Sequence, residues 1–286
     1  LCRHKKLMNK LKTEFSNISR KSILVAVTFF LSILTMPGCV TTTKILEETG
    51  LTTGKLFRQT LQHDGIEREY FVYLPSSYKD GKPLPLVITL HGYTTTATGA
   101  AQESTTGFNH YAERNGFIAV YPQGSHFTAT DKDRPPWLVT SWNDLAGNKS
   151  ESPLGPMCTA DSDQYPCPPE CGKCGRCHWT SCNDDVGFID KLLKDVKRKL
   201  NTDKNRYYLA GISNGAMMSQ RLACELSDHF AAVALIIGRL QRGYSCTPDQ
   251  PMALLQINGG QDTSVPPVKN PSVDGYYYTT ALEVST

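Results

Sequence analysis

The chain has 286 residues, of which 40% are hydrophobic and 20% are charged; this is ordinary globular composition, with the length of one large domain or two small ones. Its formal net charge of +3 is unevenly distributed, because seven Lys and Arg residues against one Glu precede residue 40 and give that segment +6, which leaves −3 for the remainder. A mildly acidic body provides no electrostatic reason to expect binding to nucleic acid.

Residues 1–39 have the pattern of an export signal. A basic region ends at Arg20 and Lys21, and the apolar run SILVAVTFFLSILTM that follows has the length of a signal peptide but is too short to span a membrane comfortably. Small residues before Cys39 resemble a lipoprotein cleavage box, so we expect Cys39 to be lipidated and to become the new N-terminus. Plain secretion and an uncleaved anchor are the alternatives. We therefore expect an exported protein, either a lipoprotein of the cell envelope or an extracellular protein.

A polar, Thr-rich tether is expected at residues 40–53, followed by a folded domain at residues 54–286. The segments KLFRQTLQ and IEREYFVYL alternate around HDG, which predicts an antiparallel hairpin. Apolar runs typical of buried strands then alternate with helical patterns. The expected strands are LPLVITLHG, FIAVYP, RYYLAGI, AAVALIIG and MALLQING, and the expected helices are FNHYAERNG, DDVGFIDKLLKDVKRKL and NGAMMSQRLACEL. This alternation predicts an α/β fold, with a mostly parallel central sheet and helices on both faces.

The pattern breaks at about residues 122–182, where Pro, Gly, Ser and Cys dominate. A stretch this long without periodicity indicates an insertion that is held by cross-links rather than by a core. Outside residues 1–39 the chain has eight cysteines, which are Cys158, Cys167, Cys171, Cys174, Cys177, Cys182, Cys224 and Cys246. An even number in an exported protein predicts disulfides, although the sequence does not determine their connectivity.

Two metal-binding alternatives use the same cysteines. Zinc could take four of the thiolates, or three of them together with His178. The C-x2-C-x2-C spacing of Cys171, Cys174 and Cys177 is similar to an iron–sulfur motif, but no proline follows the next cysteine, Cys182. We favour disulfides, and the sequence predicts no metal and no other cofactor.

The residues Gly211-Ile212-Ser213-Asn214-Gly215 match G-x-S-x-G between an expected strand and an expected helix. A serine at this position sits on a sharp, strained turn, and glycines on both sides avoid collisions with the strand and the helix. The turn lifts the hydroxyl clear of the sheet and places it at the positive end of the helix. The context predicts a catalytic nucleophile at Ser213, and the alternative is a tight turn without a catalytic role.

A serine nucleophile needs a base that takes its proton and donors that stabilise the oxyanion. One expected donor is the N–H group of Tyr93, which follows the strand end at His91 and Gly92, and the other is the N–H group of Asn214. The His91 side chain is expected to brace the loop. Asp262, in the Gly-rich turn after MALLQING, is the candidate acid, and its alternative role is turn formation.

The expected triad order on such a sheet is Ser, Asp, His, but no histidine follows His229. His126 and His178 lie in or beside the insertion and could reach the site, whereas His110 and His229 are expected to be structural. We expect instead that the C-terminal part of the protein is missing. The chain would then carry the nucleophile, the oxyanion hole and the acid without the base.

With these residues the chain resembles the family of polyhydroxybutyrate depolymerases and feruloyl or acetylxylan esterases, from about Gly54 onward and most strongly from DDVGFIDKLL to SDHFAAVA. The resemblance implies an α/β-hydrolase fold and hydrolysis of carboxylic esters without a cofactor, with Ser213 as nucleophile and Asp262 as acid. It also implies a disulfide between Cys224 and Cys246.

The chain departs from the family at several positions. Members more often have His and Thr where this chain has Asn258 and Gly260, which weakens the assignment of the acid. Their catalytic histidine follows the acid, which supports the expected truncation. The tannase-type feruloyl esterases have Cys immediately before the serine, whereas this chain has Ile212, which argues against that branch.

The insertion precedes the DDVGF helix and is expected to overhang the catalytic face as a lid or a substrate-binding wall. Its tryptophans, Trp137, Trp142 and Trp179, either stack on a sugar or phenolic acid or are buried beside the disulfides. The sequence thus favours an exported, lipid-anchored serine esterase for polysaccharide esters or hydroxyalkanoate polyesters. The alternatives are a non-catalytic lipoprotein of the same fold that binds such polymers, and a metal-binding surface protein.

Overall fold

The computed structural model describes residues 50–131, 133–145, 158–159, 165–166, 176–177, 179–242 and 247–285. The expected export signal with Cys39, most of the tether and much of the Cys-rich stretch lie outside these residues. Within the described ranges, no helix combines the length and the apolar character needed to cross a membrane.

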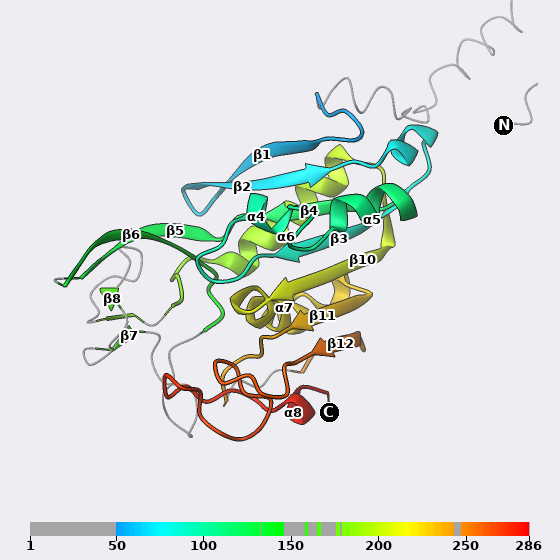
Figure 1. Ribbon diagram of the computed structural model, residues 1–286. Helices are drawn as coiled ribbons and strands as arrows, with labels where there is room; N and C mark the ends of the chain where they lie inside the picture. Colours follow the sequence, from blue (N-terminus) through cyan, green and yellow to red (C-terminus); the bar gives the residue numbers. More distant parts are fainter. Residues whose placement is uncertain are drawn as a thin grey trace, which may run out of the picture. The chain divides into compact units, whose positions relative to one another are not determined.

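The centre of the fold is a seven-stranded sheet with the order β1-β2-β4-β3-β10-β11-β12 (Figure 1). Its strands are β1 (Leu56–His63), β2 (Ile66–Tyr73), β3 (Leu84–Leu90), β4 (Ile118–Pro122), β10 (Thr202–Ile212), β11 (Ala232–Ile236) and β12 (Ala253–Ile257). β1 and β2 form the predicted antiparallel hairpin, and β2 pairs antiparallel with β4. The remaining neighbours pair in parallel, as the alternating sequence pattern predicts.

Helices cover both faces of the sheet. The α-helices are α4 (Ala97–Ala100), α5 (Phe108–Asn115), α6 (Asp185–Lys199), α7 (Asn214–Glu225) and α8 (Ala281–Ser285), and the 3-10 helices are η2 (Ser76–Asp80) and η4 (Ser227–His229). Side chains of α6 and α7 share one buried cluster with Ile118 and Val120 of β4. Side chains of α4 and α5 share a second cluster with Ala119 and Tyr121 of the same strand. Since successive strand residues point to opposite faces, the two helix pairs lie on opposite sides.

Helix α6 illustrates why the sequence forms these elements. The Asp184 side chain accepts a hydrogen bond from the Gly187 N–H group and thereby caps the N-terminus, and three basic residues occupy the last turn. Five apolar side chains, those of Phe188, Ile189, Leu192, Leu193 and Val196, recur at helical spacing and are buried in the core.

The described part of the expected insertion contains more regular structure than the sequence indicates. β5 (Ser125–Asp131) and β6 (Arg134–Ser141) form an antiparallel pair, and β7 (Cys158–Thr159), β9 (Arg176–Cys177) and β8 (Tyr165–Pro166) form a small sheet. The prediction of a stretch without periodicity was wrong for residues 125–141. Pro135 and Pro136 hide the strand pattern, because proline is unusual within a strand.

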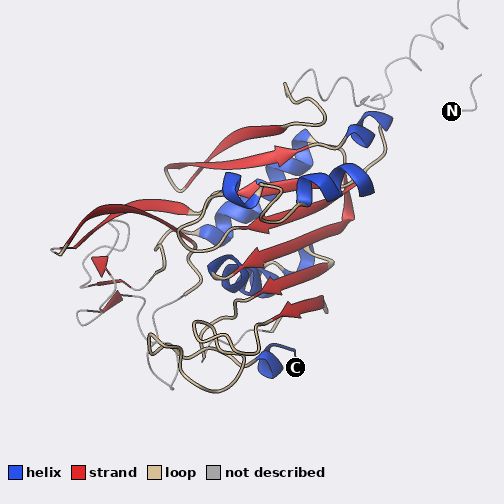
Figure 2. Ribbon diagram, viewed as in Figure 1, coloured by secondary structure: helices blue, strands red, loops and turns tan. Residues whose placement is uncertain are grey.

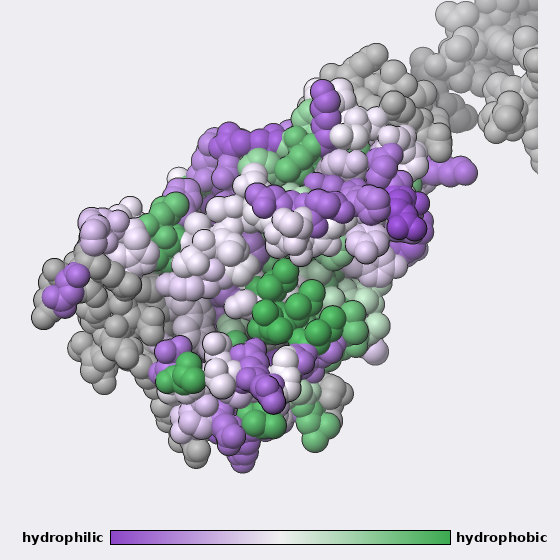
Figure 3. Space-filling view, in the orientation of Figure 1, coloured by the Kyte–Doolittle hydropathy of each residue, from purple (hydrophilic) through white to green (hydrophobic). Residues whose placement is uncertain are grey.

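The edge strand β12 is unusually exposed for a strand of a parallel sheet. Leu254, Leu255 and Ile257 are 36%, 57% and 49% exposed, so apolar side chains on both faces of the strand meet solvent. Figure 3 shows hydrophobic surface over this part of the sheet. Parallel strands are normally covered on both faces. The apolar side chains of β12 are therefore typical of an interior strand, although β12 lies at the edge of the sheet.

Candidate active site

Ser213 lies between the end of β10 and the first residue of α7, at the edge where the parallel strands end in loops (Figure 2). Its backbone has φ 54° and ψ −122°, a region that side-chain-bearing residues rarely adopt. Such a conformation costs about 1–3 kcal/mol and persists only where the surroundings enforce it. The turn is held by a 2.9 Å hydrogen bond from the Ser213 N–H group to the Ile236 carbonyl oxygen of β11.

The two glycines of the motif are required by close packing. A Cβ atom at Gly211 would overlap the carbonyl group of Gly215, and a Cβ atom at Gly215 would overlap the carbonyl oxygens of Leu90 and His91. The first turn of α7 therefore lies directly against the ends of β10 and β3. This geometry matches the predicted strand–turn–helix context of Ser213.

A cavity of about 180 Å³ opens in front of Ser213. It is lined by Tyr93, Trp179, Ser213, Asn214, Met217, Ser264, Val265, Asp274, Tyr276 and Tyr278. The structure thus brings together three predicted site residues, Ser213, Asn214 and Tyr93. Trp179 is partly exposed in this wall, whereas Trp142 is fully buried beside His91.

One expected oxyanion donor, Asn214, follows Ser213 in the chain, and the other, Tyr93, lines the same cavity. Asn214 is the first residue of α7, so its N–H group has no acceptor within the helix. Gly92 packs so closely on the nucleophile turn that an added Cβ atom would lie 3.3 Å from the Ile212 carbonyl oxygen and 3.5 Å from the Ser213 Cβ. This contact brings the adjoining Tyr93 to the same cavity.

His91 is held inside the loop rather than in the cavity. Its Nε2 accepts hydrogen bonds from the Gly124 N–H group at 2.9 Å and the Gln123 amide at 3.0 Å, which leaves Nδ1–H to donate to the Gly92 carbonyl oxygen at 2.8 Å. Burial lowers the pKa of His91 to about 4, because the charged imidazolium would lose its hydration. A neutral, fully bonded imidazole braces the loop that carries Gly92.

The Asn214 side chain forms a buried network that the sequence did not indicate. Its Oδ1 accepts the Trp142 N–H group at 2.9 Å, and its Nδ2 donates to Asp144 at 2.8 Å. The same Asp144 oxygen accepts the Trp179 indole N–H at 2.9 Å. These bonds fix the segment after β6 and the Trp179 wall to the nucleophile turn. The partners are far apart in the sequence, so no local pattern could reveal them.

Asp185 also supports the segment after β6. Its fully buried carboxylate accepts hydrogen bonds from the Arg68 guanidinium at 2.6 Å and from the Asn143 N–H group at 2.7 Å. In the sequence, Asp185 stands at the second position of the expected helix DDVGFIDKLLKDVKRKL. In the structure it also connects β2 to the loop beside the cavity.

Asp262 follows β12, where the triad acid is expected. Its Oδ1 accepts the N–H groups of Ser264 and Val265, both at 2.9 Å, and these two residues line the cavity. The side chain is partly exposed and is not itself part of the cavity wall. The structure therefore places Asp262 beside the site and also in the turn-forming role that was its alternative.

Arg239 organises the loop that carries Asp262. Its buried guanidinium donates to the carbonyl oxygens of Thr279 at 2.8 Å and Val265 at 3.1 Å, and also to the Pro266 carbonyl and the Asn258 side chain. Burial lowers the pKa of Arg239, and the nearby Asp262 carboxylate opposes this change. Asn258, one of the positions that depart from the family pattern, is thus part of the structure that holds the loop.

Besides the buried His91, the structure describes His63, His110, His126 and His229. His63 pairs with Asp184, His229 lies 3.7 Å from Asp190 and Asp228, and His110 is on α5. His126 lines a different cavity. None of the histidines that the structure describes lines the cavity at Ser213. His178 lies outside the described residues.

Two of the predicted disulfide cysteines, Cys182 and Cys224, are disulfide-bonded. Cys158 and Cys177 are opposite each other in the register of β7 and β9. Cys167, Cys171, Cys174 and Cys246 lie outside the described residues, so the connectivity, including Cys224–Cys246, stays a prediction. Among the described residues, no group of three or more His, Cys, Asp or Glu side chains could hold a metal ion.

Several curated relatives are similar to this chain, although no protein-family model matches it. It is 27% identical over 202 residues to feruloyl esterase B of Piromyces equi, over 69% of this chain and 30% of that protein. It is 23% identical over 201 residues to the bifunctional acetylxylan esterase/xylanase XynS20E of Neocallimastix patriciarum, over 70% of this chain and 22% of that protein. It is 35% identical over 89 residues to a probable feruloyl esterase C of Aspergillus niger, over 31% of this chain and 33% of that protein. The chain therefore matches about a third or less of the length of these relatives.

Among solved structures, the crystal structure of native sOPH matches with a TM-score of 0.51 and 17% identity, over 82% of this chain and 76% of that chain. A sequence identity of 17% supports a shared fold only. The mostly parallel sheet, the helices on both faces and the serine turn at the end of β10 agree with it. The chain has an α/β-hydrolase fold, and the curated proteins it resembles are esterases of the feruloyl and acetylxylan classes.

Proposed function

We propose that this protein is an exported serine esterase that hydrolyses feruloyl or acetyl esters of polysaccharide through an acyl-enzyme. The observation that carries the proposal is Ser213, held in a rare backbone conformation at the mouth of a cavity whose wall includes Tyr93 and Asn214. Strain at a single serine between tightly packed glycines is typical of a nucleophile and has no evident structural benefit. The curated relatives support the same chemistry.

In the proposed reaction, the Ser213 hydroxyl attacks the ester carbonyl as a base removes its proton. The N–H groups of Tyr93 and Asn214 stabilise the oxyanion, which collapses with release of the alcohol. A water molecule then hydrolyses the acyl-enzyme by the same steps. The rigid support of Asn214 and of the His91 loop suits donors that must already be in place when the negative charge develops.

The base in this proposal is a histidine that Asp262 orients. None of the described histidines lines the cavity, and the Asp262 loop lies beside it, where such a base would be oriented.

The cavity wall favours an aromatic acyl group. The Trp179 ring lies 4.6 Å from the Tyr276 ring and 6.2 Å from the Tyr278 ring, measured between centroids. Such a wall suits edge or offset stacking with a phenolic ring better than contact with a short aliphatic acid. We therefore place feruloyl esters first, acetyl esters second and hydroxyalkanoate polyesters third.

Export and lipidation at Cys39 would place the enzyme at the cell envelope or outside the cell, with the membrane as a partner through the lipid anchor. The bonded state of Cys182 and Cys224 supports an oxidising compartment. The competing proposal is a lipoprotein of the same fold that binds polysaccharide or polyester without catalysis.

Hydrolysis of methyl ferulate by protein expressed from the complete gene separates the two proposals. We expect turnover that Ser213→Ala abolishes, and faster turnover of methyl ferulate than of an acetyl ester with the same alcohol. Equal residual rates for the wild-type protein and Ser213→Ala would favour the binding lipoprotein. Sequencing the reading frame beyond residue 286 tests the source of the base, and a downstream histidine is the expected result.

A further inference from the structure

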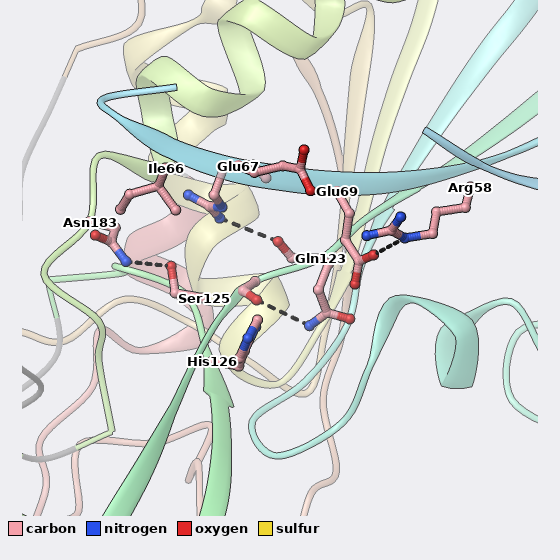
Figure 4. A pocket seen from close by; sticks show the side chains of 10 residues that line it. Arg58, Ile66, Glu67, Glu69, Gln123, Ser125, His126 and Asn183 are labelled. Atoms are coloured by element: carbon pink, nitrogen blue, oxygen red, sulfur yellow. Dashed lines mark hydrogen bonds and ion pairs between the residues drawn. The ribbon is translucent and has the colours of Figure 1, made fainter. Parts of the chain in front are cut away.

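A second cavity, of about 400 Å³, is shown in Figure 4. It lies at the start of β2, at the edge of the sheet where β10 ends (Figure 1). Its walls come from the start of β2, from residues 123–126 at the start of β5, and from Arg58 and Asn183. We infer that this cavity binds a neutral sugar residue of the polysaccharide that carries the ester. The inference rests on the proposed function and specifies how that substrate would be held.

The position of the cavity fits a polymer that also reaches Ser213. The order β2-β4-β3-β10 puts three inter-strand spacings between the strand at the cavity and the strand that ends at the nucleophile. At about 4.8 Å per spacing this separation is about 14 Å. One molecule can span it only if it is longer than the ester group itself, as an oligosaccharide is.

The two sites share a wall. Gln123 and Gly124, which line the second cavity, donate hydrogen bonds to His91 Nε2. The backbone of His91 continues into Gly92, which packs on Ser213. The His91 loop therefore fixes the distance between the second cavity and the nucleophile.

The charges around the cavity exclude an anionic ligand. Arg58 is paired with Glu69 at 2.5 Å, and Arg68 is paired with the buried Asp185 at 2.6 Å. Figure 4 shows the Arg58–Glu69 pair on one side of the cavity and the Asn183–Ser125 hydrogen bond on the other. Glu67, also in the wall, adds a second acidic group that interacts with Arg58. The lining thus carries no uncompensated arginine that could hold a phosphate or a uronic acid.

The hydrogen-bonding groups match the hydroxyl groups of a sugar. Ser125 Oγ accepts a hydrogen bond from Asn183 at 2.8 Å, which leaves its own proton to donate. The Glu67 carboxylate supplies acceptors, and the exposed His126 ring supplies a donor and an acceptor. Ile66, 41% exposed, adds an apolar surface for the C–H face of a pyranose. The cavity volume lies in the range of small-molecule sites, about 300–1,000 Å³.

Titration calorimetry with unesterified xylo-oligosaccharide tests the inference without catalysis. We expect binding to the wild-type protein and to Ser213→Ala. Affinity should fall about tenfold in Glu67→Ala and in His126→Ala, because each loses hydrogen bonds to the sugar. Glu103→Ala and His110→Ala, exposed residues of the same types outside both cavities, are the matched controls and should bind as the wild type does.

Three results would overturn the inference: no binding to the wild type, equal affinities in all four variants, or tighter binding of an acidic oligosaccharide. Failure of the sugar site can be distinguished from failure of the proposed esterase function. Binding without any ester hydrolysis would contradict only the esterase, whereas hydrolysis of methyl ferulate without oligosaccharide binding would contradict only the sugar site.

Discussion

Substitution of Arg239 by Met should destabilise the protein and loosen the loop that carries Asp262. The change keeps much of the side-chain volume but removes every donor, so the buried carbonyls of Val265, Pro266 and Thr279 and the Asn258 side chain lose their partner. A hydrogen bond to a charged donor contributes about 1.5–3 kcal/mol. The variant no longer buries a charged guanidinium group, and this gain offsets part of the loss. We therefore expect the free energy of unfolding to decrease by about 3–5 kcal/mol.

Urea denaturation of the wild type and the variant measures this decrease. Arg239→Lys should restore little of the lost stability. Its single ammonium group cannot reach all the acceptors that the planar guanidinium group, with five N–H donors, binds. Arg206→Met is the matched control: Arg206 is exposed and paired only with Asp203, so its loss should cost less than about 1 kcal/mol. A change below 1 kcal/mol for Arg239→Met would refute the assignment of Arg239 as the support of this loop.

Three further predictions concern the nucleophile turn and its brace. Ser213→Gly should raise the free energy of unfolding by about 1 kcal/mol while it abolishes hydrolysis, because glycine adopts φ 54° without strain; a loss of stability on denaturation would contradict this. Gly215→Ala should lower the free energy of unfolding by about 1–3 kcal/mol, because the added Cβ atom overlaps the end of β3. Gly260→Ala is the control and should leave stability unchanged, because no atom lies within 4 Å of an added Cβ there. Equal melting temperatures of the two variants would contradict this prediction. Because the folded-state pKa of His91 is about 4, below the ordinary histidine pKa of about 6.5, the unfolded chain binds the proton first as pH falls. Stability should therefore decrease by about 3 kcal/mol between pH 6.5 and 4, and His91→Gln should flatten this part of the pH profile; an unchanged profile would argue against the neutral brace.

The sequence predicted the features that depend on local pattern. The apolar runs of the parallel strands, the amphipathic α6 and the turn at Ser213 all follow from spacing that is readable within about a dozen residues. Chain order places the candidate acid Asp262 after β12, and its catalytic role stays a prediction. Each of these features is determined by residues that are close together in the chain.

The features that the sequence did not reveal depend on contacts between distant segments. Asp144 joins Asn214 to Trp179, and Asp185 joins β2 to the loop after β6, yet neither acid differs in its sequence context from an ordinary surface residue. Arg239 likewise satisfies acceptors that lie 19 to 40 residues further along the chain. The β5–β6 pair was missed because Pro135 and Pro136 mask it.

Mass spectrometry of the protein from the complete gene after reaction with a fluorophosphonate tests the central claim most directly. The account predicts one covalent adduct, on the peptide that contains Ser213, and no adduct in Ser213→Ala. An intact mass without adduct, or an adduct on another residue that persists in Ser213→Ala, would contradict the assignment of Ser213 as the nucleophile.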